Sequence, residues 1–187
     1  MSDKVFHVLF LSRRNSARSI LAEAVLNKMG KGRFVAHSAA VQPAEEIDPH
    51  ILDLLKQYEL HVSNTKPRHY REFAKTGSPD LDFVFTLSDT AAGEQLPEWP
   101  GQPVTAHWSS PDPILARGAE WERKRAFARV LSELERRLAI FTNLPFSSLD
   151  RKSLTHHLDE IGGKAPSADA RQAGQEATSQ HLNSIRH

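Results

Sequence analysis

The stretch that decides the fold of this chain is an apolar run followed at once by a short polar turn. It reads Val5-Phe6-His7-Val8-Leu9-Phe10-Leu11 and then Ser12-Arg13-Arg14-Asn15-Ser16-Ala17-Arg18-Ser19. The apolar run is short and rich in β-branched and aromatic residues, which is typical of a buried parallel strand. From Ala17 onward, apolar residues recur at helical spacing until Gly30, a residue that commonly ends helices. The stretch therefore predicts a strand, a tight turn and a helix N-terminus in direct succession.

This succession has the geometry of an oxyanion cradle. Successive backbone N–H groups of such a turn point inward, and the helix dipole adds partial positive charge. Arg18 lies in the first turn of the predicted helix, where its planar guanidinium suits bidentate binding of a tetrahedral oxyanion. Asn15 tolerates the left-handed backbone that tight loops need. A catalytic nucleophile would stand at the start of the loop, which is Ser12, and Ser19 is placed to hydrogen-bond to it.

The rest of the chain alternates strands with helices. We expect strands at 5–11, 34–41, 81–87 and 103–108, a short helix near 69–74, a loop at 88–101, and helices at 45–60, 118–142 and 147–161. Asp48 followed by Pro49 is typical of a helix N-cap with proline at the first helical position. The alternation predicts an α/β fold in which helices cover both faces of a parallel sheet.

Polar residues end or follow the predicted strands. Ser12, Ser38 and Ser88 stand at strand ends, and Asp112 follows the last strand. Ligands of parallel α/β sheets bind beyond the carboxyl ends of the strands, so these residues are expected to share one rim. Prolines on both sides stiffen the loop of Asp112, which places its carboxyl group to protonate a leaving group. His7 lies within a strand and is interpreted as a core or sheet-end histidine.

Composition limits the class of protein. The 187 residues carry 24 basic and 23 acidic side chains and no cysteine. A net charge of +1 argues against a nucleic-acid partner, and the absence of a long apolar segment argues against a membrane partner. The absence of cysteine excludes disulfides and thiol chemistry carried by the chain itself. We expect a cytoplasmic protein without a cofactor or metal site, built as one domain over 1–162 and a flexible tail over 163–187.

The loop resembles the Cys-x-Gly-Asn-x-x-Arg-Ser signature of the low-molecular-weight protein tyrosine phosphatases and of the thioredoxin-coupled arsenate reductases that share their fold. The likeness covers roughly residues 4–162. The resemblance implies a four-stranded parallel sheet with flanking helices, a nucleophile at position 12, an oxyanion held by residues 13–19 and a general acid at Asp112. The matching segments are 15–24, Ser88-Asp89 through Glu94, Trp99-Pro100-Gly101, His107-Trp108, Pro111-Asp112-Pro113 and 149–162.

Four positions depart from the pattern of that family. Ser12 stands where the family has its nucleophilic cysteine. Ser88 and Leu96 stand where arsenate reductases of this branch carry the cysteines that relay a disulfide. Arg14 replaces the loop glycine, beside Arg13. A deliberate cysteine-to-serine trap explains neither the leucine nor the arginines, so the pattern favours a natural cysteine-free homologue.

These departures separate binding from turnover. A serine hydroxyl needs an adjacent general base, and the sequence shows none at the loop unless His7, His37 or His107 reaches it. A neutral Ser12 does not repel an incoming dianion as a thiolate does, whereas Arg14 costs about 1–2 kcal/mol if its position requires a positive φ. Three hypotheses remain: a catalytically silent protein that binds phosphate, sulfate, an arsenate-like anion or a phosphorylated protein; a phosphatase or arsenate-related enzyme with serine-based chemistry; and an interaction scaffold with a vestigial pocket.

Overall fold

The computed structural model describes residues 4–163, so all but the first residue of the expected tail lies outside it. Four parallel strands form one sheet in the order β2-β1-β3-β4. The first strand, β1, pairs with β2 on one side and with β3 on the other, which places the polar turn after β1 at the centre of the sheet's carboxyl edge. This confirms the four-stranded parallel sheet. The strands are β1 (Phe6–Ser12), β2 (Phe34–Ala40), β3 (Phe83–Thr86) and β4 (Val104–His107).

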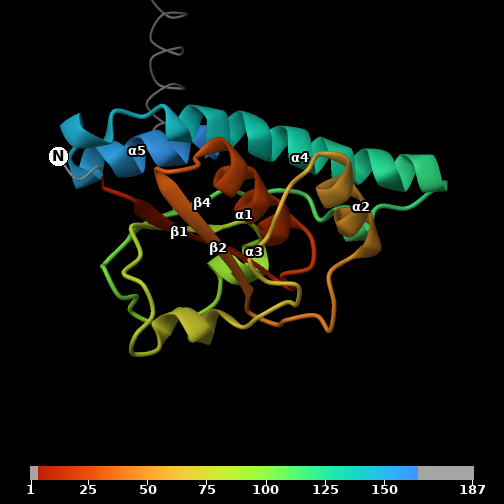
Figure 1. Cartoon of the computed structure of the whole chain (residues 1–187), viewed down its shortest axis with the longest axis horizontal. Coiled ribbons are helices and arrows are strands. Elements are labelled where there is room, and N and C mark those ends of the chain that lie inside the picture. Colours follow the sequence, from red (N-terminus) through yellow and green to blue (C-terminus); the bar gives the residue numbers. More distant parts are fainter. Residues whose placement is uncertain (1–3, 164–187) are drawn as a thin grey trace, which may run out of the picture.

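The four longer helices cover one face of the sheet (Figure 1). They are α1 (Arg18–Met29), α2 (Pro49–Gln57), α4 (Glu120–Thr142) and α5 (Arg151–Ile161). Their apolar stripes pack on the strand residues that point to this face, such as Phe10 and Phe85, which are fully buried. Burial of such a stripe, and not intrinsic propensity, supplies most of the stability of a surface helix.

Shorter elements cover the opposite face. The 3₁₀ helix η1 (Tyr70–Ala74) and the single-turn helix α3 (Asp89–Ala92) lie there with their connecting loops. They pack on the alternate strand residues, Leu9 and Leu11, because successive side chains of a strand point to opposite faces. The expected three layers are therefore present, and the second helical layer consists of short helices.

Several element boundaries differ from those expected. The helix expected over 45–60 begins only at Pro49, because the Asp48 side chain accepts a hydrogen bond from His50 N at 2.8 Å and caps it. The expected loop at 88–101 contains α3, which the Ser88 hydroxyl caps. The helix expected from residue 147 begins at Arg151, where hydrogen bonds from the backbone amide and the hydroxyl of Ser153 to the capping Asp150 lower the pKa of that carboxyl group.

Two shorter helices complete the fold, η2 (Pro113–Leu115) and η3 (Phe146–Ser148). The first follows β4, and the Asp112 side chain caps its N-terminus. No helix formed by residues 4–163 is long and apolar enough to cross a bilayer.

Candidate oxyanion-binding site

The loop between β1 and α1 is anchored from outside by the segment that follows β2. Gln42 N donates to Arg13 O at 2.9 Å, Ala44 N donates to Arg14 O at 3.0 Å, and Asp48 N donates to Ser16 O at 3.0 Å. In a trans peptide the carbonyl and the next amide point in opposite directions. Because these three carbonyls point outward, the amides of the residues that follow them, Arg14, Asn15 and Ala17, point into the loop.

Two of these inward amides lack a protein acceptor. Asn15 N donates to Ser12 Oγ at 3.2 Å, but Arg14 N and Ala17 N form no hydrogen bond within residues 4–163. Unpaired backbone donors cost free energy unless water or a ligand accepts from them. The start of α1 adds the positive end of a helix dipole at the same place. This arrangement is suited to an anion.

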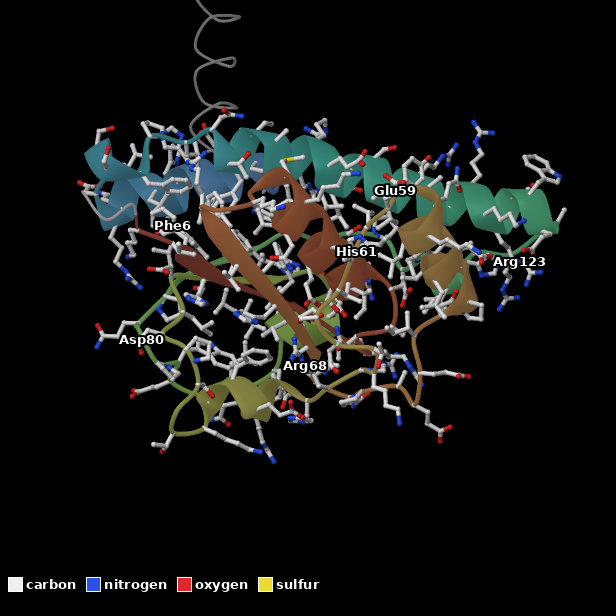
Figure 2. All side chains as sticks on the ribbon, in the orientation of Figure 1. Phe6, Glu59, His61, Arg68, Asp80 and Arg123 are labelled. Atoms are coloured by element: carbon white, nitrogen blue, oxygen red, sulfur yellow. The ribbon has the colours of Figure 1, made fainter. Side chains whose placement is uncertain are left out.

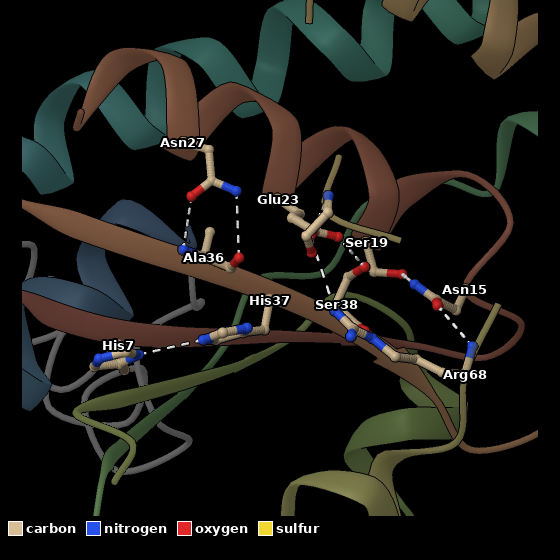
Figure 3. A network of polar contacts seen from close by, with 10 residues as sticks. His7, Asn15, Ser19, Glu23, Asn27, Ala36, His37, Ser38 and Arg68 are labelled. Carbon is tan, nitrogen blue, oxygen red and sulfur yellow. Dashed lines mark hydrogen bonds and ion pairs between the residues drawn. The ribbon is translucent and has the colours of Figure 1, made fainter. Parts of the chain in front are cut away.

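Asn15 holds the shape of the loop. Its φ is 51°, in the left-handed region, as expected from the sequence. Its amide nitrogen Nδ2 donates to Ser19 Oγ at 2.8 Å, and its oxygen accepts from Arg68 N at 3.1 Å (Figure 3). Ser19 Oγ in turn lies 2.7 Å from Ser12 Oγ. The oxygen at the nucleophile position therefore sits among donors, as the sequence led us to expect for Ser19.

Arg14 does not strain the loop. Within residues 4–163, the only non-glycine residues with positive φ are Asn15, Glu59 and Gln102. The penalty considered for an arginine at the family's glycine position therefore does not apply. The Arg14 side chain is exposed and lines a hollow with Ala44 and Ile114 instead of filling the cradle.

The structure brings Arg18 and Asp112 together. Arg18 Nη2 lies 3.2 Å from Asp112 Oδ2, and Arg18 Nη1 donates to Ser110 O at 2.8 Å. Burial lowers the pKa of the guanidinium, and the negative charge of Asp112 opposes that shift. Arg18 Nε forms no hydrogen bond within the described part of the chain. Nη1 and Nη2 are thus held by protein acceptors, and Nε remains as a donor for an oxyanion.

Both carboxylate oxygens of Asp112 accept hydrogen bonds. Oδ2 contacts Arg18, and Oδ1 accepts from Ile114 N at 3.1 Å, which caps η2. Asp112 therefore lies on the same rim as the loop, as expected from the strand ends, and its role as a general acid stays a prediction. The carboxyl group is 20% exposed and stands at the edge of the site.

None of the three histidines considered as a base hydrogen-bonds to Ser12. His7 Nδ1 lies 3.3 Å from His37 Nε2, within a stacked pair on the sheet (Figure 3). Burial, together with the charges of His7 and Arg68, lowers the pKa of His37 to about 4. His107 contacts Thr86 Oγ1 at 2.8 Å and Asp89 at 3.1 Å. Within residues 4–163, Ser12 Oγ hydrogen-bonds to Ser19 Oγ and to the Asn15 amide, and neither is a general base.

A buried polar network behind the loop was not identified from the sequence. Glu23 of α1 is 0% exposed and accepts from the hydroxyls of Ser38 at 2.5 Å and Ser63 at 2.7 Å. Arg68 donates from Nε to Ser38 O at 2.9 Å and lies beside the carboxyl end of β2 (Figure 2). Since Arg68 N also holds Asn15, the network ties the loop to β2. The sequence signal is a glutamate on the apolar face of a helix, three residues after Ile20.

The two other positions without cysteine have structural roles. Ser88 is buried and caps α3 by accepting from Ala91 N at 3.2 Å. Leu96 packs against the apolar cluster that contains Trp99. Within residues 4–163 there is no group of three or more potential metal ligands.

Comparisons with known proteins agree with this geometry. Residues 7–154 match the family model of low molecular weight phosphotyrosine protein phosphatase. An arsenate reductase of Halalkalibacterium halodurans is 29% identical over 142 residues, which cover 75% of this chain and 96% of that protein. A glutaredoxin arsenate reductase of Synechocystis sp. is 26% identical over 107 residues, 57% of this chain and 77% of that protein.

Solved structures show the same fold. An arsenate reductase of Archaeoglobus fulgidus matches with a TM-score of 0.58 and 31% identity, covering 73% of this chain and 99% of that one. An arsenate reductase in a phosphate-binding state matches with a TM-score of 0.60 and 21% identity, covering 74% and 97%. The chain belongs to the low-molecular-weight phosphotyrosine protein phosphatase family, which includes arsenate reductases among its relatives, and it has no cysteine.

Proposed function

We propose that this protein binds a tetrahedral oxyanion, such as phosphate, sulfate or arsenate, free or on a phosphorylated protein, and does not turn it over by the family's thiol chemistry. The observation that carries the proposal is the pair of inward amides, Arg14 N and Ala17 N, which have no acceptor among residues 4–163 and precede the helix that carries Arg18. Donors fixed before the ligand arrives need little reorganisation when it binds. A related arsenate reductase was solved in a phosphate-binding state, which supports an anion of this shape.

The chemistry at position 12 supports binding without turnover. A thiol begins with a pKa near ~8.5 and ionises readily in a positive loop. A serine hydroxyl ionises far less readily and needs a base, and the contacts of Ser12 Oγ supply none. Reduction of arsenate also requires electrons, and the chain has no thiol to supply them. We therefore expect the protein to bind the anion without hydrolysing or reducing it.

Titration with oxyanions tests the proposal. We expect phosphate, sulfate and arsenate to raise the unfolding temperature, whereas the planar monoanion nitrate does so less. At about ten times its dissociation constant, a ligand stabilises the native state by about 1.4 kcal/mol, from the linkage relation between free ligand and affinity. Absence of stabilisation by all three tetrahedral anions would reject the proposal.

An alternative function is that of a serine-based hydrolase, which an assay of phosphate-ester hydrolysis tests directly. We expect no hydrolysis of p-nitrophenyl phosphate by the wild-type protein between about pH 5 and 9. Ser12→Cys is expected to gain hydrolysis, because the new thiol receives the hydrogen bonds that Ser12 receives now. Wild-type turnover that disappears in Ser12→Ala would support the serine enzyme. Turnover that survives in Ser12→Ala would point to water as the nucleophile.

The remaining alternative is a scaffold with a vestigial pocket. It predicts that a protein partner binds the chain equally well after the loop is altered. Our proposal predicts that a phosphorylated partner is lost when Arg18 is replaced. Partner binding unchanged in Arg18→Ala would favour the scaffold.

A further inference from the structure

A second hollow lies away from the oxyanion loop, where the N-terminal half of α4 runs beside α2 (Figure 1). It is a cavity of about 330 Å³, within the size range of small-molecule sites. None of the loop residues 12–18 lines it. The residues on its walls that matter for recognition are His50, Asp53, Tyr58, Trp121, Lys124, Arg125 and Phe127.

Aromatic rings form the walls of this cavity. Trp121 is 63% exposed, whereas Trp99 is 8% and Trp108 is 0% exposed. On the side of α2, Tyr58 is also exposed, and the ring of His50 stacks on Phe127 with centroids 4.7 Å apart. Exposed tryptophan and tyrosine gain free energy when a flat apolar group covers them. The cavity thus favours an aromatic ring as its occupant.

Charges of opposite sign stand on its two walls. Lys124 and Arg125 come from α4, and Asp53 comes from α2. Glu120, the nearby carboxylate, is already paired with Arg123 at 2.7 Å and with His50 at 2.9 Å. Within residues 4–163, neither Arg125 nor Asp53 has an ion-pair partner. A ligand that brings both an anion and a cation would satisfy the two walls together.

We propose that this cavity binds a free aromatic amino acid. The ring lies between Trp121 and Tyr58, the carboxylate faces Lys124 and Arg125, and the ammonium group faces Asp53. The occupant follows from the aromatic walls together with the opposite charges. The site is independent of the oxyanion loop, so either can fail without the other.

Four small probes separate the parts of this recognition. L-phenylalanine has the ring and both charges, phenylacetate lacks the ammonium group, phenethylamine lacks the carboxylate, and L-alanine lacks the ring. We expect saturable binding of L-phenylalanine, seen as a shift of the Trp121 indole N–H signal in a ¹H–¹⁵N spectrum of the full chain. Each of the other probes is expected to bind at least about fivefold more weakly, the effect of losing about 1 kcal/mol.

Substitutions of the residues that line the cavity test the same contacts. Trp121→Ala, followed through the backbone amides of α4, is expected to lose binding. Arg125→Gln and Asp53→Asn are each expected to weaken it about fivefold. Arg136→Gln alters an exposed cation on the same helix outside the cavity and is expected to bind as the wild type does. All four positions are exposed, so the variants are expected to fold, which circular dichroism checks.

Three results would overturn the proposal. The first is the absence of a saturable shift at Trp121 with L-phenylalanine. The second is equal affinity for all four probes, which would mean non-selective adhesion to an apolar surface. The third is displacement of L-phenylalanine by inorganic phosphate, which would place the probe in the oxyanion loop.

Discussion

The loop at 12–18 and the segment at 88–96 both contain positions where the resemblance to arsenate reductases implies cysteines, and the residues found there have different structural roles. In the loop, Ser12 keeps an oxygen among the donors that surround the nucleophile position. In the segment, Ser88 caps α3, and Leu96 packs on the apolar core. Under the proposed function, the first replacement preserves a binding site, whereas the residues at 88 and 96 serve capping and packing. We therefore treat oxyanion binding and electron transfer as separable in this fold.

The difference follows from what holds each region. The loop is fixed by Asn15, by three carbonyl contacts to the segment after β2, and by the network of Arg68 and Glu23. Within residues 4–163, the side chain at position 12 takes part only in the hydrogen bonds to the Asn15 amide and to Ser19, and not in the contacts to the segment after β2 or to Arg68. We therefore expect the loop to keep its shape when another small residue stands there. The segment at 88–96 has no comparable frame for an anion, and its residues serve local packing.

Replacement of Arg18 should have the largest effect on phosphate binding by the loop. Arg18→Ala removes the charged fork and leaves Ser110 O and Asp112 without their partner. We expect phosphate affinity to fall by more than about 30-fold, the effect of losing at least about 2 kcal/mol at a buried charge contact. Calorimetric titration measures it. Arg13→Ala, an exposed arginine of the same loop, is the matched control and should change the affinity by only a few-fold.

Loss of Asn15 should come next. Asn15→Ala removes two hydrogen bonds and places alanine at a φ of 51°. We expect about 2–3 kcal/mol lower unfolding free energy, from about 1 kcal/mol for each hydrogen bond and about 1 kcal/mol for the left-handed backbone. Urea unfolding measures this change. Asn143→Ala, at the exposed end of α4, should cost less, and an equal cost would contradict the special role of Asn15.

A smaller effect is expected at Ser88. Ser88→Ala removes the cap of α3 and should lower the unfolding free energy by about 1 kcal/mol. Phosphate affinity should not change, because the Ser88 hydroxyl accepts from Ala91 N within α3 and not from the loop. Urea unfolding and calorimetry give the two values, with the exposed Ser132→Ala on α4 as the control. A large loss of phosphate affinity in Ser88→Ala would show that the two regions are still coupled.

The smallest effect should be a pH dependence at His50. Hydrogen bonds to Glu120 and Asp48 raise the pKa of this histidine, against a weaker opposing effect of burial, and Arg123 and Lys124 lie nearby. Because the pKa is raised on folding, the stabilisation is complete below the unfolded value near ~6.5 and is lost as the pH rises through the folded value. The unfolding temperature of His50→Gln should therefore fall below that of the wild type at about pH 5.5 and approach it near pH 9. A constant difference across this range would contradict the assignment.

Much of the fold could be predicted because its signals are local. The apolar run of β1, the cap formed by Asp48 and Pro49, and the apolar stripe of α4 each identify an element without knowledge of its neighbours. The boundaries of α2 were less clear, since the segment before it is held by contacts to the loop 30 residues earlier. The single turn of α3 is too short to show a helical period.

The residues that line the candidate site could be predicted from the sequence, but the buried network behind the loop could not. Arg18, Asn15 and Asp112 are identified by residue type and by their places at strand ends. Arg68 contacts Ser38 and Asn15, which lie 30 and 53 residues away along the chain. Glu23 contacts Ser38 and Ser63, which lie 15 and 40 residues away, and no local pattern reports such contacts. The ion pair of Arg18 with Asp112 likewise depends on the path of η2.

The central claim is that the loop holds an oxyanion with its own backbone. Its most direct test is the ¹H–¹⁵N spectrum of the full chain during titration with phosphate. We predict downfield shifts of the Arg14 and Ala17 amide protons with one saturable constant, and no such shifts in Arg18→Ala. If these two amides do not move while phosphate is added to saturation, the loop does not bind the anion, and the account is wrong.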